Sequence, residues 1–201
     1  MFKKILLILS CSFILSACNG GDNSDGIKME RQAIALTGVW STEGNDGDCI
    51  PLEGGGSMSN ELIFIDTELL ISLINDEVGD EADEYTLKDL NREIRELDHR
   101  EFQNPNGIYN SVLRNYNDNE CTELNSVIES RAIFKIDSEK TDQDGLPAYL
   151  VDAFYYDDEY VGKFAYRLDD DTLYLGVVGE NDDIIINTDF PYEYISEDVD
   201  F

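Results

Sequence analysis

The second half of the chain repeats one pattern, a short run of alternating or continuous apolar residues followed by an acidic turn. In the segment AYLVDAFYY (148–156), every second residue from Tyr149 to Tyr155 is apolar and falls on one face of a strand. Similar runs follow at 160–168, 173–178 and 184–186, with aspartate-rich residues between them. Strand-like segments at spacings of roughly ten residues, divided by turns, predict an antiparallel meander.

The first half of the chain holds the same kind of segment and one ambiguous stretch. Apolar runs occur at 61–66, 107–118 and 126–137. The segment ELLISLIN (68–75) suits either a strand or a helix. Together the runs predict one mainly β domain over 34–201, an antiparallel barrel of about eight strands.

Residues 86–102 break the strand pattern. Apolar side chains recur there at spacings of three and four, which is the stripe of an amphipathic helix. The stripe consists of Leu87, Leu90, Ile94 and Leu97. Thr86 is the predicted N-cap, with Asp89 three residues on. We predict one helical insertion, which covers a barrel opening or a sheet face; a lid or a docking element is the alternative.

The start of the chain has the form of an export signal. A short positively charged region precedes an apolar run that is too short to span a bilayer as a permanent helix. The segment LSAC (15–18) resembles the bacterial lipobox, in which the signal is cut before the cysteine and the thiol is acylated. The resemblance implies a signal peptide over 1–17 and a lipid attachment at Cys18. An ordinary cleaved signal is the alternative.

Residues 18–33 are predicted to form a lipidated N-terminus and a flexible tether, because 19–26 is rich in Gly, Asn, Asp and Ser. Several acyl chains on Cys18 would hold the protein to a membrane, since each buried CH2 contributes about 0.8 kcal/mol. Asn19 rather than aspartate follows the cysteine. By analogy with the enterobacterial sorting rule, this favours the outer membrane of a Gram-negative bacterium.

Charge narrows the range of partners. The chain has 44 acidic and 14 basic side chains, a formal net charge of −30. Loss of the signal would remove Lys3 and Lys4 and leave a charge of −32. This charge repels phosphate groups, so we expect no nucleic acid partner. It indicates solubility in a salty medium, with attraction to a basic protein or to divalent cations as the alternative.

Two cysteines remain once the N-terminal pair is assigned. Cys11 would leave with the signal and Cys18 would carry lipid, so Cys49 and Cys121 form an even pair in an oxidising compartment. We predict a disulfide between them, whose closure is worth about 4 kcal/mol in the chain-entropy model. A metal site is the alternative, although one cysteine pair and the single His99 make a poor zinc set.

A family resemblance rests on Gly38-Val39-Trp40, which is similar to the Gly-x-Trp signature of lipocalins and lipocalin-like barrels. The segments YNDNEC (116–121) and LYLG (173–176) add a likeness to small exported lipocalin-like proteins of Gram-negative bacteria. The resemblance implies an eight-stranded barrel, structural roles for Gly38 and Trp40, and a disulfide between the two cysteines above. It also implies an arginine stacked on the tryptophan, and Arg131 and Arg167 both stay open for that position.

No catalytic chemistry is predicted. His99 lies in the charged helical segment, and no nucleophile is placed beside it. The segment EGGGS (53–57) lacks the lysine and the strand–helix context of a phosphate loop. Oxygen ligands gather at 137–145 and 45–48, but neither segment has EF-hand spacing, and an ordinary acidic turn is favoured over calcium binding. We therefore expect no enzyme, no metal site and no cofactor.

These inferences predict a lipid-anchored cell-envelope lipoprotein with a non-enzymatic role. The first functional hypothesis is a binding module for a small hydrophobic molecule, which needs a barrel cavity of about 300 Å3 or more. The alternative is an acidic interaction or inhibitor lipoprotein that binds a basic partner, in the manner of lipocalin-like lysozyme inhibitors. Binding of that second kind would weaken steeply with salt.

Overall fold

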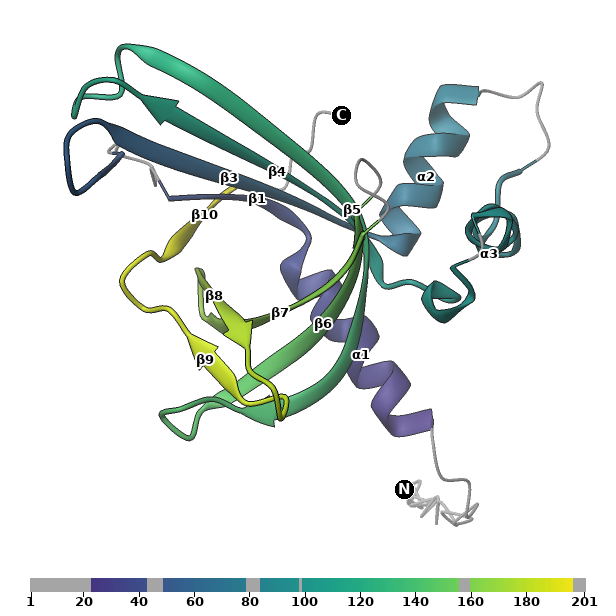
Figure 1. Ribbon diagram of the computed structural model, residues 1–201. Helices are drawn as coiled ribbons and strands as arrows, with labels where there is room; N and C mark the ends of the chain where they lie inside the picture. The colour runs from purple at the N-terminus through teal and green to yellow at the C-terminus, as the bar shows by residue number, and fades with distance from the viewer. Residues whose placement is uncertain (1–22, 43–48, 79–83, 98, 156–159, 197–201) are drawn as a thin grey trace, which may run out of the picture.

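A closed antiparallel β-barrel forms the body of the protein in the computed structural model (Figure 1). The structure describes residues 23–42, 49–78, 84–97, 99–155 and 160–196. The ring consists of β1 (Gly38–Ser41), β3 (Ser57–Asp66), β4 (Gly107–Tyr116), β5 (Leu124–Thr141), β6 (Pro147–Tyr155), β7 (Tyr160–Asp169), β8 (Thr172–Val178) and β10 (Tyr192–Ser196). It closes because β1 pairs with both β3 and β10. The predicted barrel of about eight strands is confirmed.

Two short strands widen the sheet without entering the ring. β2 (Ile50–Pro51) pairs with the first residues of β3, and β9 (Ile184–Ile186) pairs with the last residues of β8. β10 pairs with the beginning of β8, and β9 pairs with the end of β8 along the same edge. Ile184 and Ile186 pack against Ala148 and Ala165 on the outer face of the barrel.

The interior core follows the two-residue period of the strands. Alternate residues point inward and pack as one cluster, and Phe64, Phe134 and Tyr166 in it are fully buried. The buried members of the cluster are Ala33, Leu36, Trp40, Leu62, Phe64, Tyr109, Ala132, Phe134, Ile136, Tyr149, Val151, Ala153, Tyr166, Leu173 and Tyr192. Large side chains therefore fill the barrel through much of its length.

The N-terminal segment corrects one prediction. The tether predicted over 18–33 is wrong from residue 23 onward, because α1 (Asn23–Leu36) is a helix whose Ala33 and Leu36 belong to the barrel core. Met29 packs against the same cluster, so apolar residues at spacings of four and three form the buried stripe. The helix contacts β3 and β5, and it closes the barrel end at which β3 terminates. We call this end the closed end.

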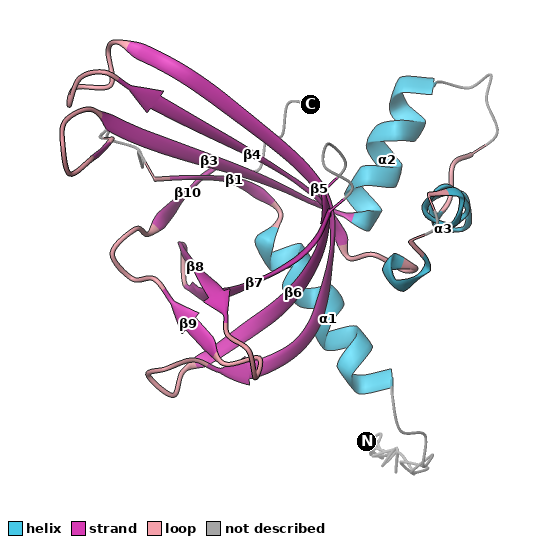
Figure 2. Cartoon of the chain, in the orientation of Figure 1, coloured by secondary structure: helices cyan, strands magenta, loops and turns pink. Residues whose placement is uncertain are grey.

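The helical insertion is longer than predicted and contains two helices. α2 (Thr67–Val78) takes up the ambiguous segment 68–75, so only its helical interpretation is right. α3 (Leu87–Glu96) and a 3-10 turn, η2 (Arg100–Phe102), replace the single helix predicted over 86–102 (Figure 2). Leu90 and Ile94 pack on Ile133 and Phe154 on the outer face of the sheet, as one of the predicted options required. No helix in the described part of the chain is long and apolar enough to span a membrane.

β5 joins the two halves of the barrel. Its first part pairs with β4, and β6 joins its other edge only from Ala132 onward. The tips of β3, β4 and β5 therefore extend past the end of β6, at the barrel end opposite to α1 (Figure 1). We call this opposite end the mouth.

Candidate functional site

Gly38 and Trp40 have packing roles at the closed end. The Trp40 indole Nε1 donates to the Leu36 carbonyl at 2.7 Å, and its ring meets Tyr194 edge to face at a centroid distance of 5.0 Å. Gly38 has a φ of +135°, and a Cβ there would lie 2.5 Å from the Tyr194 ring. A glycine at this position therefore allows β1 and β10 to approach closely.

The arginine of the lipocalin pattern has a different position here. Arg167 lies on the outer face of β7, where its guanidinium stacks over Tyr174 at 4.9 Å. It is buried and pairs with Asp142 at 2.5 Å and with Asp169 at 3.0 Å. The observed ring partner of Trp40 is Tyr194. The arginine stack implied by the resemblance is therefore not supplied by Arg167, which instead supports the β6–β8 surface from outside.

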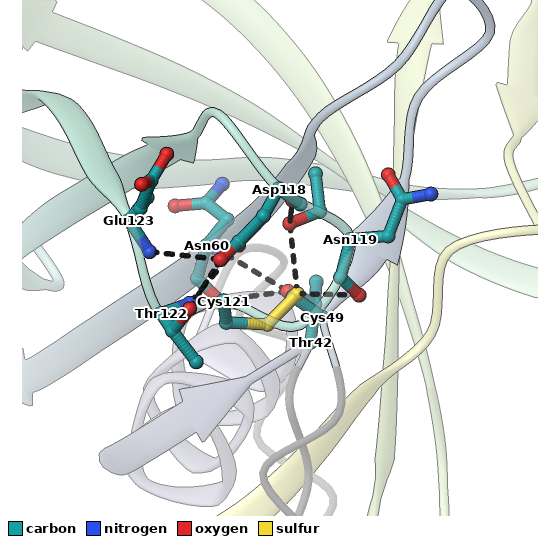
Figure 3. Close-up of a disulfide and its surroundings, with 9 residues drawn as sticks. Thr42, Cys49, Asn60, Asp118, Asn119, Cys121, Thr122 and Glu123 are labelled. Atoms are coloured by element: carbon teal, nitrogen blue, oxygen red, sulfur yellow. Dashed lines mark hydrogen bonds between the residues drawn. A yellow bond between two sulfur atoms is a disulfide. The ribbon is translucent and has the colours of Figure 1, made fainter.

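The predicted disulfide is confirmed. Cys49 and Cys121 are bonded, with a Cα–Cα distance of 6.0 Å and a sequence separation of 72 (Figure 3). The bond ties the segment before β2 to the turn between β4 and β5. The Asp118 carboxylate in that turn accepts hydrogen bonds from Thr122 and from the Glu123 N–H, and the Thr122 hydroxyl is the first of the contacts that lower the pKa of Asp118. The disulfide thus secures the tip of the extended hairpin.

The acidic segment 137–145 folds as a turn, the interpretation favoured over calcium binding. One oxygen of Asp142 accepts the N–H groups of Asp144 and Leu146, each at 2.9 Å, and the other pairs with Arg167. The carboxylate is thereby engaged in structural bonds. Within the described residues, no group of three His, Cys, Asp or Glu side chains is placed to hold a metal ion. The other acidic segment, 45–48, lies outside them.

His99 was predicted to lie within the helical segment. It lies after the end of α3 and directly before η2. Its ring packs on Phe154 at a centroid distance of 3.9 Å and faces the edge of Phe102. These contacts attach the insertion to the outer surface of β6. The histidine therefore has a packing role in the insertion.

The mouth is where the barrel exposes apolar side chains on its inner face. Ile128 shares a face with the core residues Ala132 and Phe134, and Val177 shares a face with Leu173. Ile185 is opposite Val177, and Tyr160 lies near Tyr155. The exposed fractions are 53% for Ile128, 60% for Tyr160, 64% for Val177 and 53% for Ile185. Ile185 lies on β9, which packs over the outer face through Ile184 and Ile186, so its side chain turns away from the interior. We call the other three residues, Ile128, Tyr160 and Val177, the apolar rim.

Below the rim, the barrel interior carries a neutral polar network. Asn60 donates to the Tyr192 hydroxyl at 2.9 Å and accepts from the Ser111 hydroxyl at 3.1 Å. The Tyr109 hydroxyl donates to the Tyr155 hydroxyl. Burial first, and then the contact with Tyr155, raises the pKa of Tyr109 far above its ordinary value; burial also raises the pKa of Tyr192. These phenols are protonated at neutral pH, so the network offers uncharged donors and acceptors.

One pocket of about 530 Å3 lies beside Val177, at the β8–β9 hairpin. Its lining consists of residues from β8, from β9 and from the loop that leads to β10. The lining residues are Leu175, Gly176, Val177, Ile185, Ile186, Asn187, Thr188 and Asp189. The Asp189 N–H donates to the Asn187 side chain at 3.0 Å, which shapes the loop. An apolar wall thus meets a single carboxylate residue at this pocket.

A second groove of about 540 Å3 lies outside the barrel, between α1, α2 and β5. Several of its polar groups already have structural partners. Asp66 accepts the N–H groups of Glu68 and Leu69 and caps α2, while Lys135 donates to the Gln103 carbonyl at 3.1 Å. We therefore take the mouth, whose apolar side chains are exposed, as the candidate site.

Comparison with models of known protein families, with curated proteins and with solved structures finds no match. The predicted lipid-attachment residue Cys18 and the signal peptide over 1–17 lie outside the described residues. Of the remaining predicted site residues, Gly38 and Trp40 meet near the closed end, and Cys49 and Cys121 meet near the mouth. Sequence reasoning missed the apolar rim, although each of its members stands in a segment that was predicted to be a strand.

Proposed function

We propose that this protein is a lipid-anchored lipoprotein of the cell envelope whose barrel binds a small apolar molecule at its mouth. One observation carries the binding proposal: Ile128, Tyr160 and Val177, from β5, β7 and β8, lie on the inner face of their strands and are each more than half exposed. Exposed apolar surface that lines a concavity is typical of a ligand site.

The filled interior of the barrel favours a shallow site near the mouth. The closed end is filled by Trp40, Tyr166 and the end of α1. A ligand would therefore lie between the rim and the polar network around Asn60, with its apolar part against the rim.

Replacing Ile128 by aspartate is expected to weaken binding of the neutral fluorescent probe N-phenyl-1-naphthylamine by about tenfold, because a carboxylate would be desolvated against the ligand. The probe's fluorescence in a titration measures the affinity. Val127→Asp is the matched control: Val127 is the preceding residue, is 45% exposed and points to the opposite face of β5. Equal affinities of the two variants, or no saturable binding to the unmodified protein, would contradict the proposal.

The anchor proposal rests on the likeness of residues 15–18 to the lipobox, with Cys18 as the acylated residue. Replacing Cys18 by serine is expected to move the protein from the membrane fraction to the soluble fraction, because the acceptor thiol for acylation is lost. Fractionation of the expressing bacterium, followed by immunoblotting, measures the shift. Unchanged sedimentation with membranes would overturn the assignment; Cys11→Ser is the control and should stay with the membranes.

Binding of a basic protein partner is the second candidate function. The partner would bind at the edge of β5. Within the described residues, no strand pairs with the edge of 124–131 that faces away from β4. An extended basic segment would add a strand there. We rank this candidate second because Glu129 and Arg131 place charges along the edge, which natural sheets use to discourage strand addition.

A further inference from the structure

We propose that the groove outside the barrel, between α1, α2 and β5, docks a cationic amphipathic helix of a partner protein. Two features of this one groove carry the proposal: a partly exposed apolar floor, and exposed carboxylates from three elements around it. The groove lies at the closed end of the barrel, so the proposal does not depend on ligand binding at the mouth.

The floor of the groove is apolar and open to solvent. It is formed by Met29, Ala33, Ile34, Ile71, Leu87 and Ile136. Ile34 is 52% exposed and Leu87 is 39% exposed, although α1 and α3 both turn other apolar side chains toward the barrel. α1 and α2 diverge from the closed end and leave the floor uncovered between them (Figure 1). An apolar groove of this kind suits the apolar face of a helix.

Three exposed carboxylates line the same groove. Glu30 lies on α1, Glu68 on α2 and Asp137 on β5. Asp137 stands at a β-bulge, where the register with β6 shifts between Ile136 and Ser138. Bulges re-aim side chains and are frequent next to functional sites. This bulge places Asp137 in the groove lining together with its neighbour, the buried Ile136.

The negative charge of the groove is not balanced by its own lining. Among the described lining residues, Lys135 is the only basic one, and its ammonium group donates to the Gln103 carbonyl at 3.1 Å. Lysine or arginine side chains of a partner would therefore meet the three carboxylates, whereas an acidic partner would be repelled. Floor and charge together favour a partner helix that is apolar on one face and basic at its borders.

The groove is formed before a partner binds. The Thr67 hydroxyl donates to the Pro105 carbonyl at 2.8 Å and ties the start of α2 to the loop before β4. The Thr37 hydroxyl, directly after α1, donates to the Asp66 carboxylate at 3.0 Å, and Asp66 caps α2. Walls held in this way lose little conformational entropy on binding.

Synthetic peptides test the apolar and the charged feature separately. A fluorescein-labelled amphipathic helix with leucine on one face and lysine on the other is titrated with the protein, and fluorescence anisotropy measures its affinity. Replacing every lysine by glutamate, or every leucine by serine, is expected to weaken binding about tenfold or more. No saturable binding of the leucine–lysine peptide, or equal affinity of the serine analogue, would overturn the proposal.

Ile34→Gln tests whether the peptide lies in the groove. It is expected to weaken peptide binding about fivefold, because an exposed apolar side chain is lost from the floor. Ile185→Gln is the matched control, since Ile185 is 53% exposed and lines a different pocket. Equal peptide affinities of the two variants would overturn the proposal. So would an Ile34→Gln effect seen only on N-phenyl-1-naphthylamine binding or only on a dimer in ultracentrifugation, which would assign the groove to a small molecule or to a second copy.

A double variant tests the carboxylates. Glu30→Gln combined with Glu68→Gln is expected to weaken peptide binding about fivefold and to reduce its dependence on salt. Glu129→Gln combined with Glu193→Gln is the control, because it removes the same charge from exposed residues outside the groove lining. Equal losses in the two double variants would show that the charge of the whole surface, and not the groove, attracts the peptide.

Discussion

Replacing both Cys49 and Cys121 by alanine is expected to lower the free energy of unfolding by about 4 kcal/mol. The disulfide closes a loop with a sequence separation of 72, so its loss restores much conformational freedom to the unfolded chain. Chemical denaturation of the unmodified and the double variant proteins, followed by the fluorescence of Trp40, measures the difference.

A reducing agent gives the matching control. It is expected to destabilise the unmodified protein by about as much as the double substitution does, and to leave the double variant unchanged. Superimposable unfolding curves for the unmodified protein and the double variant would show that the crosslink contributes no stability. Loss of the crosslink also frees the turn after β4, so we expect weaker probe binding at the neighbouring rim residue Ile128.

The barrel itself could be predicted because its strands carry their own signal. Alternation from Tyr149 to Tyr155 and the acidic turns between the later strands predict a meander without knowledge of long-range contacts. The disulfide followed from an even count of cysteines. α1 was missed because the Gly- and Asp-rich composition around residue 22 outweighed the spacing of Met29, Ala33 and Leu36. That spacing was a usable helical signal.

The rim could not be predicted from the sequence because it depends on register. Alternation shows that Ile128 and Val127 face opposite ways, but not which of them faces the barrel interior. Ala132, four residues further along β5, belongs to the interior core, and the register with β4 keeps the alternation continuous between the two positions. Ile128 therefore faces inward and Val127 outward. The direction of the Arg167 side chain could not be predicted for the same reason. Its strand was predicted, but alternation alone does not show which face of the strand is outside the barrel.

Replacing Arg167 by methionine is expected to lower the free energy of unfolding by about 3–5 kcal/mol, because it leaves the buried Asp142 carboxylate without its partner. The Arg167 side chain is 7% exposed and that of Asp142 is fully buried. Urea denaturation at pH 7 measures the loss. Arg92→Met is the control, since the Arg92–Asp89 pair lies at the surface, where solvent screens it, and its loss should change stability little. Equal losses in the two variants would contradict a special role for the buried pair.

The pH dependence of stability gives a second measure of the same pair. Burial alone would raise the pKa of Asp142, but the Leu146 N–H, the Arg167 guanidinium and the Asp144 N–H together lower it. A carboxyl group whose pKa is lower in the folded state stabilises the fold above its unfolded pKa of about 3.9, and this contribution is lost as the pH falls through the folded pKa. Arg167→Met removes one cause of the depression, so the stability lost between pH 5 and about pH 2 should be smaller in this variant than in the unmodified protein. An identical acid-induced loss in both would mean that Arg167 does not set the ionisation of Asp142.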